Sequence, residues 1–117
     1  MIQNTPKQIS AHDLNIWLLN DSCQLTVIDV REDEELSIAP FPDPVIHLPL
    51  SKASLWISKI PQKISLSGPV VVVCHSGQRS WDFGNWLIQQ KFGYEVWNLE
   101  GGIDSWSVNV DPSISRY

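Results

Sequence analysis

The sequence predicts an α/β fold built on a mostly parallel sheet, and two patterns indicate it. Short runs rich in β-branched residues alternate with segments of helical periodicity, as in strands joined by crossover helices. Four consecutive valines at 70–73 are typical of a strand buried on both faces, the kind found inside parallel sheets. Because the chain has 117 residues and an ordinary globular composition, we expect residues 1–117 to form a single domain.

The first half of the chain contains three predicted strands, at residues 7–9, 25–30 and 45–48. Ser10 is predicted to cap a helix that runs to about Asn20, because Asp13 follows it by three positions. The acidic run 32–35 begins a short helix and is interpreted as a solvated face. Prolines stiffen the loop that follows at 38–44.

The segment on either side of the valine strand is predicted to be helical. A turn or two of helix at 54–60 should end before Pro61, because proline interrupts a helix interior. The main helix is predicted to run from Arg79 to Lys91, and Gly93 is the expected left-handed residue just beyond its end.

The last strand is predicted at 94–99, and a short helix follows it. Gly101 and Gly102 allow the sharp turn that this helix requires, and Trp106 is expected to close the core. Nothing in the sequence assigns chemistry to the C-terminal segment, residues 111–117.

Cys74 is the candidate nucleophile, because it ends the valine run and precedes small and polar residues. Its thiol should lie at the carboxyl end of a central strand, the edge where open α/β sheets bind ligands. A tight loop into a helix points backbone N–H groups inward, and Arg79 adds positive charge at the far rim. Such a site favours a thiolate over a thiol. Gly77 is where the loop is expected to need a positive φ or a close backbone approach. The alternative is a buried structural cysteine, but the polar residues after Cys74 argue against it.

Asp29 and Arg31 end the strand at 25–30 and should reach the same edge of the sheet as Cys74. Asp29 is able to accept hydrogen bonds from loop N–H groups, and Arg31 to brace the loop or attract substrate. Alternatively, the two side chains pair with each other or with neighbours. We favour support of the scaffold over direct chemistry.

Three segments resemble, in order, the motifs of rhodanese-type sulfurtransferases. The loop at 74–80 reads Cys-x-x-Gly-x-Arg-Ser, residues 29–32 read Asp-Val-Arg-Glu, and residues 99–106 read Leu-x-Gly-Gly-x-x-x-Trp. The family's Gly-His-Ile-x-Gly-Ala segment is missing at 38–44, a departure that concerns the shape of that loop.

The resemblance implies a five-stranded sheet with helices on both faces. It also implies that Cys74 takes sulfane sulfur from a small anionic donor such as thiosulfate. The resulting persulfide would pass that sulfur to cyanide, a thiol or a protein acceptor. The loop residues expected to bind substrate are His75, Ser76, Gly77, Gln78, Arg79 and Ser80, with Asp29 and Arg31 in support. No metal or organic cofactor is required.

Two other functions compete with sulfur transfer. Cysteine phosphatases and arsenate reductases also pair a cysteine with an arginine across an anion-binding loop. Protein tyrosine phosphatases have five residues between the two, whereas four separate Cys74 from Arg79 here, and the smaller ring suits a single extra sulfur. The other possible function is that of a persulfide carrier or interaction module, which serves a partner enzyme through the same cysteine.

Composition and charge exclude several classes. A net charge of −5 argues against a nucleic-acid surface, and no apolar stretch approaches membrane-spanning length. The sequence begins without the pattern of a signal peptide, and two cysteines form no disulfide framework, so we expect a reducing cytoplasm. Cys23 precedes its strand whereas Cys74 follows its own. In a parallel sheet the two thiols would lie at opposite edges, which predicts no disulfide between them.

Overall fold

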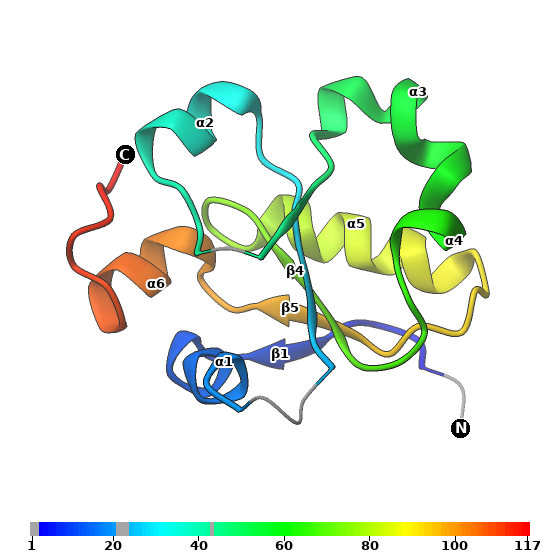
Figure 1. Cartoon of the computed structure of the whole chain (residues 1–117), viewed down its shortest axis with the longest axis horizontal. Helices are drawn as coiled ribbons and strands as arrows, with labels where there is room; N and C mark the ends of the chain where they lie inside the picture. The colour runs from blue at the N-terminus through cyan, green and yellow to red at the C-terminus, as the bar shows by residue number, and fades with distance from the viewer. Residues whose placement is uncertain (1–2, 21–23, 43) are drawn as a thin grey trace.

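The computed structural model describes residues 3–20, 24–42 and 44–117. Helices, short 3₁₀ segments (η) and strands alternate along these ranges (Figure 1). In chain order the elements are β1 (Lys7–Ile9), α1 (Ala11–Leu18), β2 (Thr26–Asp29), α2 (Asp33–Ile38), β3 (Ile46–His47), η1 (Leu50–Lys52), α3 (Ala53–Trp56), η2 (Ile57–Lys59), α4 (Ile60–Lys63), β4 (Val70–Val73), α5 (Gln78–Gln89), β5 (Val96–Leu99) and α6 (Gly102–Asn109).

The five strands form one sheet in the order β1-β5-β4-β2-β3. Every pairing is parallel, so the predicted α/β class is confirmed and the sheet is wholly rather than mostly parallel. Strand β4 lies in the middle, where Val70 pairs with Thr26 of β2 on one side and with Val96 of β5 on the other. β-branched side chains suit this pleated, two-sided position.

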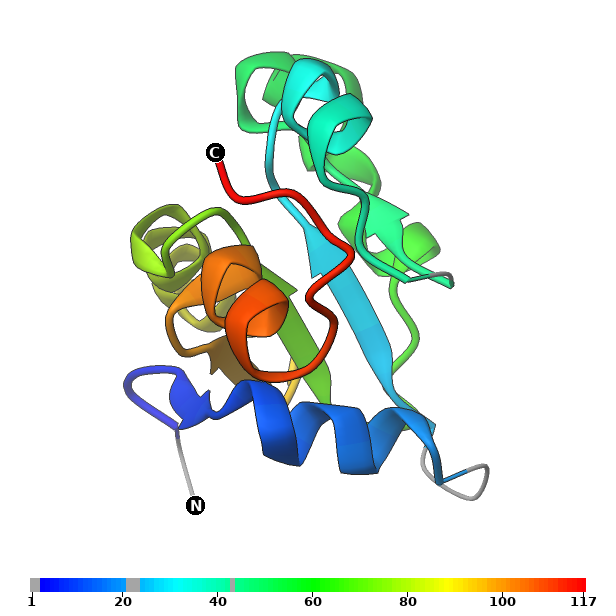
Figure 2. The same cartoon turned by 90° about the vertical axis from the view of Figure 1, so that its left-hand side faces the viewer.

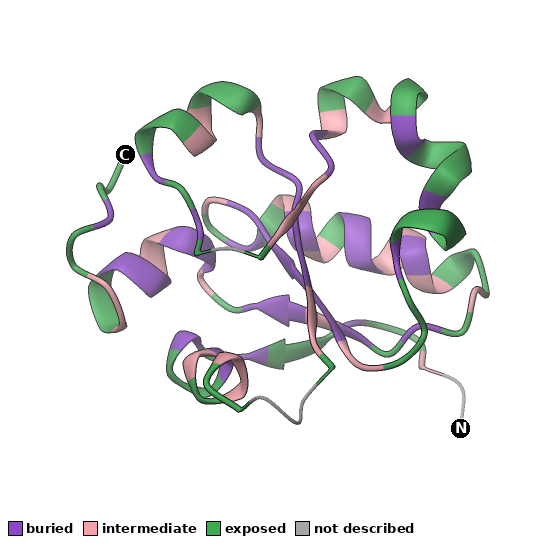
Figure 3. Ribbon diagram, in the orientation of Figure 1, coloured by how far each residue is buried: buried purple, intermediate pink, exposed green. Residues whose placement is uncertain are grey.

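Helices cover both faces of the sheet, and the valines of β4 alternate between the two layers. Val70 and Val72 pack in a core with residues of α3, α4 and α5, whereas Val71 and Val73 pack with residues of α1 and α6. All four valines have no exposed surface, and burial is concentrated on the strands and on the inner faces of the helices (Figure 3). Trp106 is 2% exposed and closes the second core, as predicted.

Local signals at the helix ends are partly confirmed. Ser10 caps α1, because its hydroxyl accepts a hydrogen bond from Asp13 N at 3.1 Å.

The prediction that Gly93 is the left-handed residue just beyond α5 is wrong. The helix closes at Gln90, and the first left-handed residue beyond it is Lys91 (φ 60°), two positions before Gly93 (φ 96°). Backbone bonds to the last turn of α5 from Gln90 N and Lys91 N end the helix before the glycine is reached.

Proline does not end the helical segment after β3. The helical turns continue through η1, α3, η2 and α4 to Lys63, and Pro61 lies in the first turn of α4. The prediction that the helix stops before Pro61 is therefore wrong. A proline is tolerated in the first turn, because the amide it lacks has no partner within the helix there.

The carboxyl ends of the parallel strands lie at one edge of the sheet. Val73 and Leu99 end β4 and β5, and Asp29 ends β2, so the loops that follow gather at that edge (Figure 1). Figure 2 shows the C-terminal segment running from α6 back toward α2.

The predicted separation of Cys23 from Cys74 concerns a residue outside the described ranges. In the described part of the chain, no helix is long and apolar enough to cross a membrane.

Candidate active site

The Cys74 thiol lies directly after β4, at the head of a tight loop. Its side chain is 1% exposed and joins the apolar core that includes Phe83. Gly77 N donates a hydrogen bond to Cys74 Sγ at 3.1 Å, and Ser80 Oγ lies 3.2 Å from the same sulfur. Gly77 has the expected positive φ, 104°, and caps α5. The sulfur therefore faces two hydrogen-bond donors at the N-terminal end of a helix, where negative charge is stabilised.

A buried polar network supports Ser80. Its hydroxyl lies 2.5 Å from Asn98 Oδ1, on β5, as well as near the sulfur. Asn98 Nδ2 in turn donates to Gly77 O at 3.2 Å and to Gln8 Oε1 at 3.1 Å. Because a serine hydroxyl has one proton, Ser80 can donate to Cys74 Sγ or to Asn98 Oδ1, but not to both at once.

The first turn of α6 holds the loop from the other side. Ile103 N donates to Cys74 O at 2.8 Å, and Asp104 N donates to His75 O at 3.1 Å. Gly102 permits this approach: a Cβ there would lie 2.4 Å from the carbonyl oxygens of Cys74 and His75. Its φ is also positive, 61°, so both the conformation and the close contact require glycine.

Arg79 is held by a carboxylate of α2. Its Nη1 and Nη2 donate to Glu35 Oε1 and Oε2 at 2.7 and 2.8 Å. Hydrogen bonding by Arg79 lowers the pKa of Glu35 to about 2, against the opposing effect of partial burial, and Glu35 raises the pKa of Arg79. Glu35 is 18% exposed, so the interpretation of the 32–35 run as a solvated face is wrong at this position.

Asp29 and Arg31 form a fully buried ion pair beneath the same edge. Arg31 N and Nε donate to Asp29 Oδ1 at 3.0 Å, and Nη2 donates to Oδ2 at 2.8 Å. Burial alone would lower the pKa of Arg31, but hydrogen bonds to Asp29 and Tyr117 raise it above its ordinary value. Arg31 also donates to Ala39 O at 2.8 Å, so the pair fixes the chain on both sides of α2.

The remaining loop side chains, those of His75, Ser76 and Gln78, have surroundings of their own. The His75 ring stacks on Tyr117, with centroids 4.0 Å apart and an interplanar angle of 12°. Ser76 and Gln78 are exposed and line a polar cavity of about 450 Å³ together with Trp81, Asn98 and Glu100. The loop thus has an inner side at the thiol and an outer, polar side.

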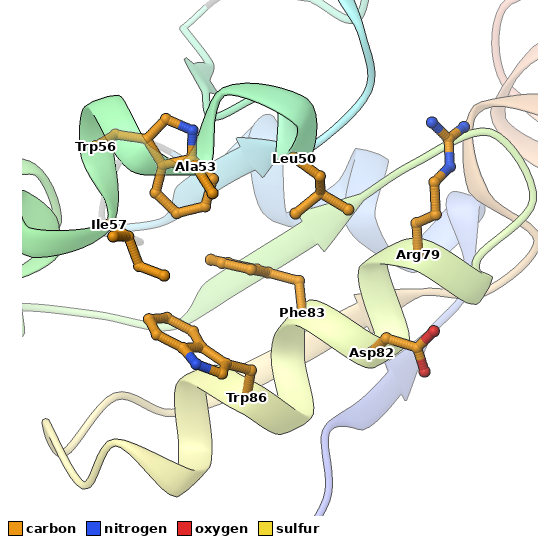
Figure 4. Close-up of a pocket in the computed structure, with 8 residues that line it drawn as sticks. All are labelled: Leu50, Ala53, Trp56, Ile57, Arg79, Asp82, Phe83 and Trp86. Atoms are coloured by element: carbon orange, nitrogen blue, oxygen red, sulfur yellow. The ribbon is translucent and has the colours of Figure 1, made fainter.

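An apolar pocket of about 280 Å³ adjoins the loop at Arg79 (Figure 4). Its wall consists of Leu50, Ala53, Trp56, Ile57, Phe83 and Trp86. Figure 4 shows Arg79 and Asp82 at the end of α5 nearest the loop, Phe83 and Trp86 farther along that helix, and Trp56 opposite them on α3. Arg79 therefore belongs both to the loop and to the rim of this pocket. Among the described residues, no cluster of His, Cys, Asp and Glu is arranged to hold a metal ion.

Comparison with known proteins places the chain in a family. The rhodanese-like domain family matches residues 12–109. The chain belongs to this family. A rhodanese-like domain protein from Staphylococcus aureus has the same fold, with a TM-score of 0.71 at 24% identity over 95% of this chain and 98% of its own.

Relatives of this rhodanese-like chain include proteins named for sulfur transfer. It is 34% identical over 97 residues to a sulfurtransferase of Allochromatium vinosum, covering 83% of this chain and 85% of that protein. It is 40% identical over 97 residues to rhodanese-like/PpiC domain-containing protein 12, chloroplastic, of Arabidopsis thaliana. That match covers 83% of this chain but only 31% of the plant protein. The Allochromatium vinosum relative supports sulfur transfer as the general class of reaction.

Three residues of the rhodanese-like site were not identified from the sequence: Glu35, Asn98 and Tyr117. Glu35 had one available signal, because it lies three residues after Glu32, and Glu32 N donates to Glu35 Oε1 at 3.1 Å in the first turn of α2. Asn98 is a polar residue between two apolar ones inside the strand predicted at 94–99, and the structure buries it, as happens to polar groups that have hydrogen-bond partners. Tyr117 carried no local signal, since its contacts are with residues far away in the chain.

Proposed function

We propose that this chain is a sulfurtransferase that moves sulfane sulfur from a donor such as thiosulfate to a nucleophilic acceptor through a persulfide on Cys74. The observation that supports it most directly is the setting of the Cys74 sulfur, which accepts a hydrogen bond from Gly77 N and lies within hydrogen-bond distance of the Ser80 hydroxyl. Two donors aimed at one buried sulfur suit a negative charge there, on the free thiolate and on the persulfide.

In the first half-reaction, the Cys74 thiolate attacks the outer sulfur of thiosulfate. The sulfur–sulfur bond of the donor breaks, and sulfite leaves with the electron pair of that bond. In the second half-reaction, the acceptor, cyanide or a thiolate, attacks the outer sulfur of the persulfide, and the Cys74 thiolate is released. Atoms and charge balance without an oxidant, a metal or an organic cofactor.

Ser80 is proposed to follow the charge on sulfur. While Cys74 is a neutral thiol, the Ser80 proton is best placed on Asn98 Oδ1, 2.5 Å away. When the sulfur is a thiolate, the hydroxyl turns toward Sγ at 3.2 Å. Gly77 N needs no such movement, because its N–H already points at Sγ. The loop therefore responds to the change in charge with one rotation of a hydroxyl group.

Arg79 is proposed to draw the anionic donor to the loop. Its side chain is 38% exposed although Glu35 holds the guanidinium in a bidentate pair. The pair fixes the plane of the guanidinium and leaves part of it facing solvent, where it can meet an incoming anion. The acceptor is proposed to be a thiol or a protein-borne nucleophile in a reducing compartment such as the cytoplasm.

Loss of turnover in a matched pair of variants tests the proposal. Cys74→Ser should abolish thiosulfate:cyanide sulfur transfer, while Cys23→Ser keeps it near the wild-type rate. Circular dichroism of both variants checks that the fold is intact. Substantial turnover by Cys74→Ser would show that another group is the nucleophile. Faster cleavage of a phosphate ester than use of thiosulfate would favour the phosphatase alternative.

A persulfide carrier would share the same cysteine, and the number of turnovers separates it from an enzyme. An enzyme discharges its persulfide to cyanide and is recharged by thiosulfate many times. A carrier that needs a partner protein accumulates the persulfide and stops after one equivalent. We expect many turnovers with small substrates alone.

A further inference from the structure

The C-terminal segment returns to the candidate active site through Tyr117. The Tyr117 ring stacks on His75, the residue that follows the nucleophile, with centroids 4.0 Å apart. Its hydroxyl accepts a hydrogen bond from Arg31 Nη1 at 2.9 Å and donates one to Glu35 Oε2 at 2.8 Å. One side chain therefore contacts the loop, the buried Asp29–Arg31 pair and α2.

These contacts connect the two ends of the loop. Glu35 Oε2 accepts hydrogen bonds from the Tyr117 hydroxyl and from Arg79 Nη2, both at 2.8 Å. The phenol thus meets the partner of Arg79 at one end of the loop, while its ring covers His75 at the other. Tyr117 forms a bridge across the loop, from the residue after Cys74 to the arginine that closes it.

The other sides of Cys74 are already occupied. The core lies beneath it, Gly77 and Ser80 contact its sulfur, and the first turn of α6 holds its carbonyl. The residue is 1% exposed in this arrangement. On the side of the loop that Tyr117 covers, an acceptor that attacks the outer sulfur of a Cys74 persulfide approaches past the side chains that Tyr117 connects.

The bridge can be displaced without disturbing the sheet. Ile114 is buried, and its carbonyl accepts a hydrogen bond from Ser107 Oγ at 2.5 Å, so the segment is anchored that far. Among the residues that the structure describes, two side chains hold the segment beyond Ile114: Arg116, which pairs with Asp104, and Tyr117 with its three partners. Tyr117 remains 38% exposed. Its side chain can therefore leave His75, Arg31 and Glu35 and uncover the loop with the loss of few buried contacts.

We propose that Tyr117 is a specificity-determining residue, whose bridge across the loop admits small acceptors to the Cys74 persulfide more readily than bulky thiols. This inference rests on the proposed function. Cyanide is small enough to reach the outer sulfur past a closed bridge. A bulky thiolate must first displace the stacked ring, after which it attacks the outer sulfur and Cys74 leaves as a thiolate.

Competition between two acceptors tests this role, with thiosulfate as the donor. The quantity to measure is the ratio of kcat/KM for glutathione to that for cyanide. Tyr117→Ala should raise this ratio roughly fivefold to tenfold, because it removes both the stack and the hydrogen bonds that a bulky acceptor must break. Tyr117→Phe keeps the ring on His75 but loses the hydrogen bonds to Glu35 and from Arg31, so the ratio should rise only about twofold. Ser115→Ala, an exposed change in the same segment, should leave it unchanged.

A merely structural role for Tyr117 would lower both rates together and leave the ratio constant. That outcome would overturn the inference, as would a fall of the ratio in Tyr117→Ala. Because the variants are compared through a ratio, a partial loss of folded protein does not imitate the expected result.

Alkylation of Cys74 separates failure of this inference from failure of the proposed function. In a Cys23→Ser background, the rates of reaction with iodoacetamide and with a bulky fluorescein maleimide are compared. Tyr117→Ala should accelerate the maleimide roughly fivefold relative to iodoacetamide, whether or not the protein transfers sulfur. A shifted alkylation ratio in a protein that shows no turnover would refute the proposed sulfurtransferase function and support the Tyr117 bridge. Unchanged alkylation ratios in active variants would overturn the bridge alone.

Discussion

Replacement of Glu35 by glutamine should destabilise the protein in a manner that depends on pH. Glu35 accepts hydrogen bonds from Arg79, from Tyr117 and from Glu32 N, and the contacts with Arg79 are the main reason why its pKa is lowered to about 2. The substitution Glu35→Gln would keep the size of the side chain but remove its charge. The variant therefore isolates the electrostatic contribution of one carboxylate that links α2, α5 and the C-terminal segment.

The magnitude follows from the lowered pKa. A fall from the ordinary value of 4.5 to about 2 corresponds to about 3 kcal/mol, at about 1.4 kcal/mol per pKa unit. Partial exposure of Glu35 and of Arg79 screens the pair, so we expect Glu35→Gln to lower the free energy of unfolding by about 1–2 kcal/mol near neutral pH. A carboxylate whose pKa is lowered on folding stabilises fully above its unfolded pKa. That stabilisation is lost as the pH falls from about 4.5 toward 2.

Urea unfolding followed by circular dichroism measures the difference between wild type and Glu35→Gln from neutral pH down to about pH 3. The gap in the free energy of unfolding should narrow steadily below about pH 4.5, since the wild type loses the stabilisation that the variant lacks. Glu34→Gln, an exposed carboxylate beside it on α2, should change the free energy of unfolding by less than about 0.5 kcal/mol. A gap for Glu35→Gln that stays constant with pH would refute the assigned origin of this stabilisation.

Substitutions at three further positions have direct expectations. Arg79→Ala should raise the KM for thiosulfate roughly tenfold, because it removes a cation at the loop and leaves the negative charge of Glu35 unpaired. Arg79→Lys should recover only part of the lost affinity. An unchanged KM in Arg79→Ala would contradict the role of Arg79 in drawing the donor to the loop. Gly102→Ala should destabilise by about 2 kcal/mol or more, because the new Cβ would overlap the Cys74 and His75 carbonyls, and chemical denaturation measures it; a neutral effect would contradict the close packing of α6 on the loop. Cys23→Ser should keep turnover, and peptide mapping of oxidised protein should find no Cys23–Cys74 link.

Local sequence patterns were sufficient to predict a parallel α/β sheet, whereas its five strands and two helical layers were implied by the family resemblance. β-branched runs predict β2 and β4, and the position of Cys74 after four valines places it at the carboxyl edge. The positive φ at Gly77 and the Ser10 cap were also predictable, because each depends on neighbours within a few residues. Such features are decided by backbone sterics and short-range hydrogen bonds, which the sequence displays directly.

Element ends depend on tertiary packing and were less predictable. Gly93 was the natural candidate for the residue beyond α5, but backbone bonds end the helix earlier and Lys91 adopts the left-handed conformation instead. Pro61 similarly occupies the start of a new helical turn, where it is compatible with the helix. In both cases the residue type correctly indicated a special backbone position, but its place relative to the helix was predicted wrongly.

The polar connections around the loop could not be predicted, because they join distant parts of the chain. Arg79 and Glu35 are 44 residues apart, and Tyr117 and Glu35 are 82 apart. Helical periodicity places Glu35 on a short exposed-looking helix, and only the fold brings it to the arginine. The C-terminal segment, to which the sequence assigned no chemistry, supplies the Tyr117 bridge for the same reason.

The mass of the intact protein after incubation with thiosulfate tests the central claim most directly. Persulfide formation on Cys74 should increase the mass by one sulfur atom, and cyanide should remove that sulfur and yield thiocyanate. The added sulfur should persist in Cys23→Ser and be absent from Cys74→Ser. Wild-type protein that gains no sulfur, or Cys74→Ser that still gains it, would contradict a persulfide on Cys74.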